Sequence, residues 1–187
     1  MKSKKILPSI VSTVAIFAML NGCTTAAKKL EKQHQASSDV NSTLDAFYIQ
    51  ASNAREIVYA APASLVCPKI TKGGFLVGVE SGICALQVNG ITQEYYHTTA
   101  VKMGLLAGVE SHSMILIFND MASLEDFRID GKDLEVGSNL SITTTQKGAS
   151  GAIDAPNTAI NAYIFSDAGL MGDLSLEGTT FKKLSKE

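Results

Sequence analysis

The stretch Leu65–Gly90 reads LVCPKITKGGFLVGVESGICALQVNG, and it decides the fold that we expect. Apolar and β-branched runs alternate in it with glycines, a pattern typical of short strands joined by tight turns. Glycine reaches positive φ without steric cost, so the glycines mark the turns. The stretch therefore predicts strands over Phe75–Glu80 and Ile83–Val88, with turns at Gly73-Gly74 and Ser81-Gly82.

A long helix is predicted before this stretch. Apolar residues recur at spacings of three and four from Val40 to Ala61, which places them on one face of a helix. Asp39 or Asn41 can serve as the N-cap, and Pro62 ends the pattern.

The rest of the chain predicts short strands and one short helix. Asn119-Asp120 is a capping signal for a helix over Met121–Arg128, with Leu124 and Phe127 facing inward. The combination indicates an α+β domain: a curved antiparallel sheet or barrel-like half-shell of short strands, with the long N-terminal helix packed on it. Further strands are predicted over Gln93–Thr99, Ser113–Phe118, Leu134–Thr145, Ala159–Phe165, Leu170–Leu176 and Thr180–Leu184.

Three motifs resemble those of the SYLF domain, a lipid-binding family. The first is the glycine-rich stretch, the second is the apolar run Ser113–Phe118, and the third is Phe165–Gly178, which contains Gly-Leu-Met and Ser-Leu-Glu-Gly. The resemblance covers about Ala61 to Leu184 and implies binding of anionic phospholipid. In the first motif the matching residues are Val66, Pro68, Lys69, Gly74, Phe75, Gly78, Gly82 and Leu86.

Residues 1–22 predict a bacterial lipoprotein signal peptide. A lysine-rich start precedes an apolar run that is too short and interrupted to span a membrane. The run ends in Leu20-Asn21-Gly22-Cys23, which resembles the lipobox, whose cysteine thiol carries a diacylglycerol. An ordinary secretory signal followed by an unrelated cysteine is the alternative interpretation.

This interpretation divides the chain into a signal peptide (1–22), an acylated tether (23–38) and a SYLF-like domain (39–187). Three acyl chains on Cys23 would form a stable membrane anchor, since two already suffice. Thr24 follows the cysteine, which by resemblance to the Gram-negative sorting rule favours the outer membrane, facing the periplasm. The association of eukaryotic SYLF proteins with actin is not expected to transfer to an envelope lipoprotein.

Charge and motif content argue against several functions. Removing residues 1–22 removes three lysines and no acidic residue, so the formal net charge falls from −2 to −5, and nucleic-acid binding is not expected. The sequence contains no nucleophilic, paired-carboxylate or phosphate-loop motif. His97 and His112 match no zinc spacing with Cys67 or Cys84. We expect neither an enzyme nor a cofactor or metal site.

Two cysteines remain once Cys23 is acylated. Cys67 and Cys84 are an even pair that an oxidising periplasm would allow to form a disulfide. In the chain-entropy model such a bridge stabilises the fold by about 3 kcal/mol. Two buried thiols on neighbouring strands are the alternative.

The sequence leaves two functions open. In the first, the domain binds phospholipid at the glycine-rich turn. There the ammonium groups of Lys69 and Lys72 meet a phosphate, and Gly73 and Gly74 let backbone N–H groups approach it. Solvated turn lysines are the alternative for this pair. In the second, the chain is a structural or interaction lipoprotein that holds an unidentified envelope protein and binds no free lipid.

Overall fold

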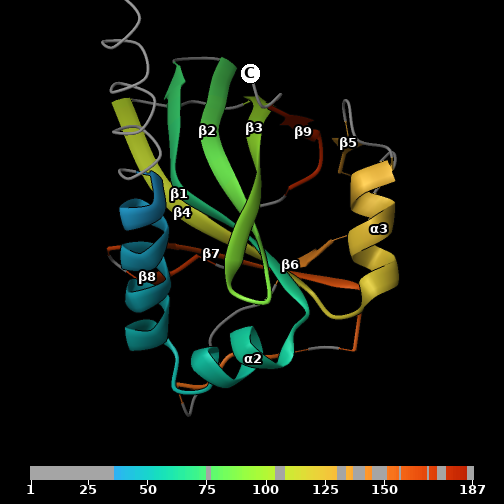
Figure 1. Cartoon of the computed structure of the whole chain (residues 1–187). Helices are drawn as coiled ribbons and strands as arrows, with labels where there is room; N and C mark the ends of the chain where they lie inside the picture. Colours follow the sequence, from blue (N-terminus) through green and yellow to red (C-terminus); the bar gives the residue numbers. More distant parts are fainter. Residues whose placement is uncertain are drawn as a thin grey trace, which may run out of the picture. The chain divides into compact units, whose positions relative to one another are not determined.

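A computed structural model describes residues 36–74, 77–103, 108–129, 134–136, 142–144, 151–155, 157–167, 169–171 and 176–184 (Figure 1). The chain divides into two compact units, Met1–Ser38 and Asp39–Glu187. Of the first unit only residues 36–38 are described, and they are helical. The predicted signal peptide and Cys23 lie outside the described residues. Within them, no helix combines the length and the apolar character that crossing a membrane requires.

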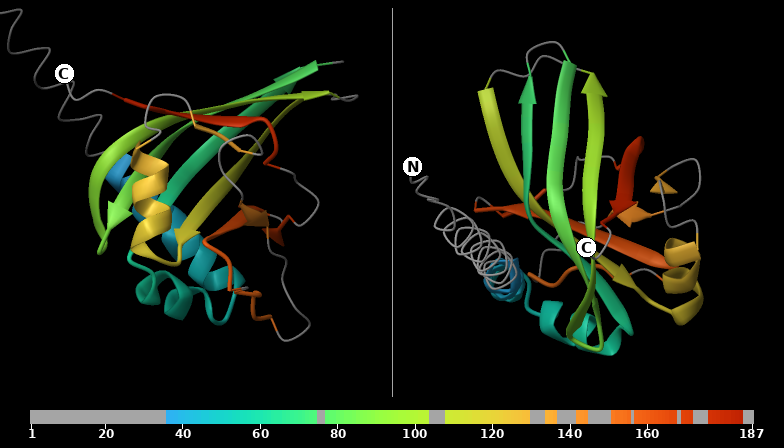
Figure 2. Two further views of the ribbon diagram at one scale, coloured as in Figure 1. Left: turned by 90° about the vertical axis from the view of Figure 1, so that its right-hand side faces the viewer. Right: turned by 45° about the horizontal axis from the view of Figure 1, so that its top comes forward.

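Nine strands of the described residues form one sheet in the second unit (Figures 1 and 2). Their order is β5-β9-β3-β2-β1-β4-β7-β6, with β8 beside β7. Every pair is antiparallel except β6 and β7. The strands are β1 Ala63–Gly74, β2 Val77–Val88, β3 Ile91–Met103, β4 Gly108–Phe118, β5 Leu134–Glu135, β6 Thr143–Thr144, β7 Ile160–Ser166, β8 Gly169–Leu170 and β9 Thr179–Lys183.

The α+β class and the largely antiparallel sheet are confirmed, but the central strands are longer than predicted. The turn expected at Ser81-Gly82 is wrong, because β2 runs straight through it and Ser81 pairs with Thr71 of β1. Gly82 serves a close approach of strands instead of a turn. A Cβ there would lie 2.7 Å from the carbonyl oxygen of Lys69 and 3.1 Å from Ile70 Cγ1.

The single long N-terminal helix is also wrong. The helix described over 36–50 ends at residue 50, and a second helix, α2 Ala54–Ala60, follows it. Asn53 fixes the break: its side-chain amide donates to the carbonyl oxygen of Ile153, and its side-chain oxygen accepts from the Ile153 N–H, both at 2.9 Å. Ala51 and Ala54, at the break, are both buried, so the apolar face predicted from the sequence continues from one helix to the next.

The helix 36–50 covers one face of the sheet. Its Phe47 is fully buried, with its ring centroid 5.2 Å from that of Tyr163 and 5.5 Å from that of Phe165, both on β7. Val66 of β1 and Ile115 of β4 belong to the same apolar cluster. This is the packing of helix on sheet that the sequence predicts.

The opposite face is covered by α3, Met121–Ile129. As predicted, Leu124 and Phe127 are buried, and Asp120 caps the helix by accepting a hydrogen bond from the Ser123 N–H at 2.7 Å. Phe127 is the centre of an aromatic group whose other rings lie 5.0 to 5.8 Å from it. These rings belong to Tyr96, Phe118 and Phe181.

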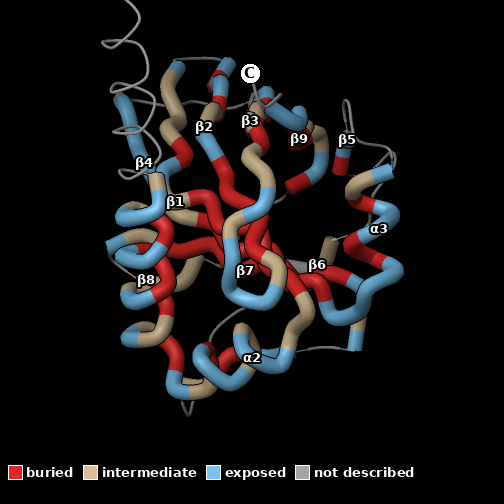
Figure 3. The backbone as a smooth tube through the Cα atoms, viewed as in Figure 1, coloured by how far each residue is buried: buried red, intermediate tan, exposed pale blue. Residues whose placement is uncertain are grey.

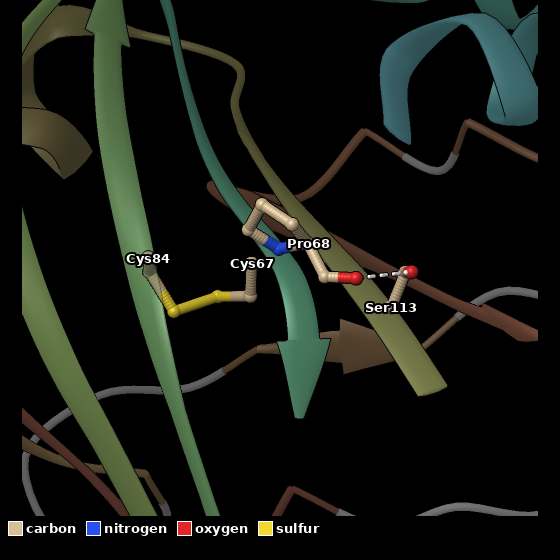
Figure 4. The surroundings of a disulfide bond; sticks show 4 residues. All are labelled: Cys67, Pro68, Cys84 and Ser113. Carbon is tan, nitrogen blue, oxygen red and sulfur yellow. Dashed lines mark hydrogen bonds between the residues drawn. A yellow bond between two sulfur atoms is a disulfide. The ribbon is translucent and has the colours of Figure 1, made fainter. Parts of the chain in front are cut away.

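Pro68 divides β1 into two halves. Proline cannot donate to a sheet ladder, and it is tolerated inside a sheet mainly at bulges. The pairing of β1 shifts between Val66 and Lys69 against β2, and between Cys67 and Ile70 against β4. The Ser113 hydroxyl donates to the Pro68 carbonyl oxygen at 2.7 Å (Figure 4).

Most of the two apolar clusters lies on the side of this bulge where β1 begins, although Ile70, just beyond it, belongs to the cluster that α3 covers. Beyond the bulge the same four strands continue, and we call residues 69–74, 77–83, 97–103 and 108–113 the distal sheet. Figure 2 shows these strand ends running on past the helices. Figure 3 shows exposed and intermediate residues alternating with buried ones along these strand ends.

Candidate functional site

The two lysines predicted to act together lie on opposite faces of the distal sheet. Side chains alternate along a strand, and Lys69 and Lys72 are three residues apart in a regular part of β1. Lys69 is exposed. Lys72 is mostly buried, with its Nζ 4.0 Å from Glu80 Oε1. The structure therefore does not bring the two ammonium groups to one phosphate.

The two glycines of the predicted site also play different parts. Gly74 ends β1 with a φ of 155°, and a Cβ there would collide with the Val77 carbonyl oxygen, so the hairpin needs glycine. Gly73 lies inside the pairing, opposite Val79 on one side and Val109 on the other. Glycine has no side chain, so nothing from Gly73 covers the exposed Val79 and Val109 on either side of it.

One face of the distal sheet carries a row of valines. Val109, Gly73, Val79 and Val101 are consecutive cross-strand partners on β4, β1, β2 and β3. Each of the three valines is more than half exposed, and Val77, two residues before Val79 on β2, is half exposed. We call this row the valine row, and the face that bears it the valine face.

Two polar rows follow the valine row along the valine face. The first is made of hydroxyl side chains, Ser111, Thr71, Ser81 and Thr99, paired in that order across the strands. The second, the basic row, runs through the cross-strand partners Lys69, Ile83, His97 and Lys182. His97 Nε2 and Ser81 Oγ, from neighbouring rows, share a 2.9 Å hydrogen bond.

The position of Lys182 in the basic row is fixed by its neighbour. Lys183, on the other face of β9, holds Glu94 of β3 with an Nζ–Oε1 distance of 2.7 Å. Burial raises the pKa of Glu94. Hydrogen bonds from Lys183 and Tyr96, with the charges of Lys183 and Arg128, outweigh it and hold that pKa below its usual value. Glu94 therefore stays ionised and fixes the orientation of β9.

The opposite face, which we call the polar face, carries mixed charges. Lys72, Glu80 and Glu110 are cross-strand neighbours there, and His112 lies two residues from Glu110. Glu80 and His112 are more than nine-tenths buried, and Glu80 Oε1 has no hydrogen-bond partner. Burial lowers the pKa of His112. Both acidic residues of the distal sheet are on this face, whereas Glu135 of β5, opposite Thr180 of β9, lies on the valine face.

Cys67 and Cys84 lie opposite one another at the bulge. Their sulfur atoms are bonded at 1.96 Å, and their Cα atoms are 4.0 Å apart (Figure 4). Both residues are fully buried at the border between the core and the distal sheet. Among the described residues, no group of three or more His, Cys, Asp or Glu side chains is placed to hold a metal ion.

Sequence reasoning found Lys69 but missed the rest of the valine face. Val77 and Val79 belong to an alternation of apolar residues, which predicts a half-buried strand. That alternation does not predict which side of the strand is buried. Val101, Val109, His97 and Lys182 come from three other strands, and only the pairing register places them in the same rows.

Comparison with known families agrees with the motifs in the second half of the chain. Residues 99–187 match the family model Ysc84, described as Las17-binding protein actin regulator. This is the SYLF family, so the predicted resemblance is confirmed over these residues. They include Ser113–Phe118 and Phe165–Gly178, while the glycine-rich stretch lies before the match. A search of curated proteins found no match to the chain.

Proposed function

We propose that this chain, whose residues 99–187 carry the Ysc84 match, binds membranes containing anionic phospholipid through its valine face. The observation that carries the proposal is the charge of that face. Lys69 and Lys182 lie on it with His97, and the one described acidic residue that strand pairing places there is Glu135 of β5, at the end of the hydroxyl row. The net charge of the mature chain would oppose binding, so the attraction must be local. Charges beyond about 8 Å are largely screened at physiological salt.

The predicted anchor at Cys23 supports the same role. An acylated cysteine would hold the domain beside a membrane, where a weak surface contact becomes effective because the local concentration of lipid is high. In this proposal the protein is an envelope lipoprotein without catalytic activity, and the tether (23–38) lets the valine face reach the lipid.

The test uses a pair of double variants with equal loss of charge. All proteins carry Cys23→Ser in the full chain, so that no acyl chain anchors them. Lys69→Ala/Lys182→Ala removes two cations from the valine face, and each is worth about 1 kcal/mol near an anionic surface. Affinity for phosphatidylglycerol-containing vesicles, measured by co-sedimentation, should fall about thirtyfold.

The matched control is Lys72→Ala/Lys102→Ala, which removes two cations from the polar face. It should change the affinity less than threefold, and circular dichroism should show that both variants are folded. Equal losses from the two pairs would mean diffuse attraction and would contradict a site on the valine face.

A protein-binding role is the second candidate, and one observation favours it. Residues 108–112 of β4 pair with β1, while no described strand pairs with their other edge. Such an edge can accept an extended peptide by strand addition. The family description names a protein partner, Las17, and actin regulation for its members. If the Cys23→Ser protein binds no anionic vesicle even at low salt, this second function replaces the first.

A further inference from the structure

The distal sheet buries one face, with Ile70 and Ala100 beside polar residues, and exposes valines on the other. On its polar face, Glu80 and His112 are 7% and 8% exposed, whereas Val79, Val101 and Val109 on the other face are 52%, 64% and 77% exposed. Isolated exposed apolar residues are normal on proteins, but a contiguous group of them marks a surface that another molecule covers. Val79 and Val101 are direct cross-strand partners, and Val109 lies in the same row on the other side of Gly73, which adds no side chain between them.

The order of side chains along the valine face matches the layers of a membrane surface. From the strand ends inward come the valine row, the hydroxyl row and the basic row. Gly73 and Lys69 mark the first and last rows on β1, four residues apart. At about 3.3 Å per residue this separation is about 13 Å. Apolar groups of interfacial proteins enter a bilayer by about 5–10 Å, which places cations one layer behind them at the phosphates.

We propose that the valine row penetrates the hydrocarbon margin of an anionic bilayer while Lys69 and Lys182 contact lipid phosphates. This inference rests on the proposed function and adds the direction in which the domain meets the membrane. The described strand ends, at Gly74 of β1 and Val77 of β2, point into the bilayer. The polar face, which carries Glu80 and His112, stays turned toward the rest of the protein.

Charge favours lipid over a second copy of the chain as the occupant. Two copies packed through the same face in a symmetric dimer would bring the lysines of both basic rows together. Glu135 is the one described acidic side chain that strand pairing places on that face, against two lysines in each copy. An anionic membrane supplies both an apolar layer for the valines and phosphates for the lysines.

The chain contains no tryptophan, so a single introduced indole reports its own surroundings. We would compare Val109→Trp with Glu110→Trp in full-length Cys23→Ser protein. The two positions are adjacent on β4 and face opposite sides of the sheet. With phosphatidylglycerol vesicles, Val109→Trp should show a blue-shifted emission and strong quenching by lipids brominated on the acyl chains. Glu110→Trp should show neither.

The outcomes separate this inference from the proposed function. If both proteins co-sediment with the vesicles but neither indole is quenched, the domain binds at the phosphates without inserting, and only the inference is wrong. Equal quenching of the two indoles would contradict insertion through one face. A concentration-dependent blue shift of Val109→Trp without vesicles would identify a second copy as the occupant. Absence of co-sedimentation would reject the proposed function itself.

A substitution series tests the valine row without an introduced probe. Val79→Ser/Val101→Ser/Val109→Ser should lower vesicle affinity about thirtyfold, because three exposed aliphatic groups no longer leave water on binding. The matched control is Ile49→Ser/Ile91→Ser/Ile129→Ser, whose isoleucines are 86%, 69% and 77% exposed elsewhere on the domain. It should leave the affinity within about threefold. Equal losses in the two series, with unchanged melting temperatures, would overturn the proposal.

Discussion

The same four strands, β1 to β4, behave differently on the two sides of the Pro68 bulge. On the core side, neighbours such as Leu65 and Val66, or Ile115 and Leu116, are apolar on both faces and fully buried, because α3 covers one face and the helix 36–50 the other. In the distal sheet the neighbours alternate between apolar and polar. The valines of one face are exposed, whereas on the other face Glu80 and His112 are buried beside Ile70 and Ala100. Alternation in a sequence thus indicates a two-sided strand, but not which side faces the core.

Truncating the centre of the aromatic group gives the largest expected effect on this contrast. Phe127→Ala should lower the free energy of unfolding by about 3–5 kcal/mol, because it removes a fully buried ring packed among Tyr96, Phe118 and Phe181. Urea unfolding followed by far-ultraviolet circular dichroism measures it. The control Val109→Ala, in the distal sheet, should cost less than about 0.5 kcal/mol. Similar costs at both positions would mean that the two regions are packed alike.

The bridge at the border between the two regions should have the next largest effect. Cys67→Ala/Cys84→Ala should lower the free energy of unfolding by about 3 kcal/mol in the chain-entropy model. A reductant should destabilise the parent protein and leave the double variant unaffected. Mass spectrometry after alkylation without reduction should find neither cysteine modified. Modification of both would show that they are free thiols.

The parts of the fold that could be predicted from the sequence depend on local signals. The cap at Asp120, the inward side chains of α3 and the buried run Ser113–Phe118 are each specified by residues within a few positions of one another. The break in the N-terminal helix could not be predicted in this way. It depends on Asn53 and Ile153, which are a hundred residues apart in sequence.

The candidate site shows the same limit. A spacing of three residues puts Lys69 and Lys72 together if the segment is a turn, but on opposite faces if it is a strand. The difference depends on whether Ser81-Gly82 is a turn or a close approach to Lys69, which is a property of two strands and not of one. The valine row needs the register of four strands, so no single stretch of sequence contains it.

The smallest expected effect tests the buried side of the distal sheet through its pH dependence. His112 faces Glu80 and Glu110, whose charges raise its pKa, and Lys72 and Lys102, whose charges lower it. Burial is the largest influence and sets the net direction, below the usual value. As the pH falls through about 6.5, the unfolded chain therefore takes up a proton that the folded chain still refuses.

The sign follows from linkage: the unfolded state binds more protons in this window, so stability is present above pH 6.5 and is lost as the pH falls toward the folded-state pKa. One proton gives a slope of at most about 1.4 kcal/mol per pH unit. His112→Gln should therefore flatten the dependence of unfolding free energy on pH between about 7.5 and 5.5. His97→Gln, a histidine replacement on the valine face, retains His112 and should keep its contribution to the slope. If His112→Gln leaves the slope unchanged, the polar face is open to water, and the contrast between the two faces of the distal sheet is weaker than the structure indicates.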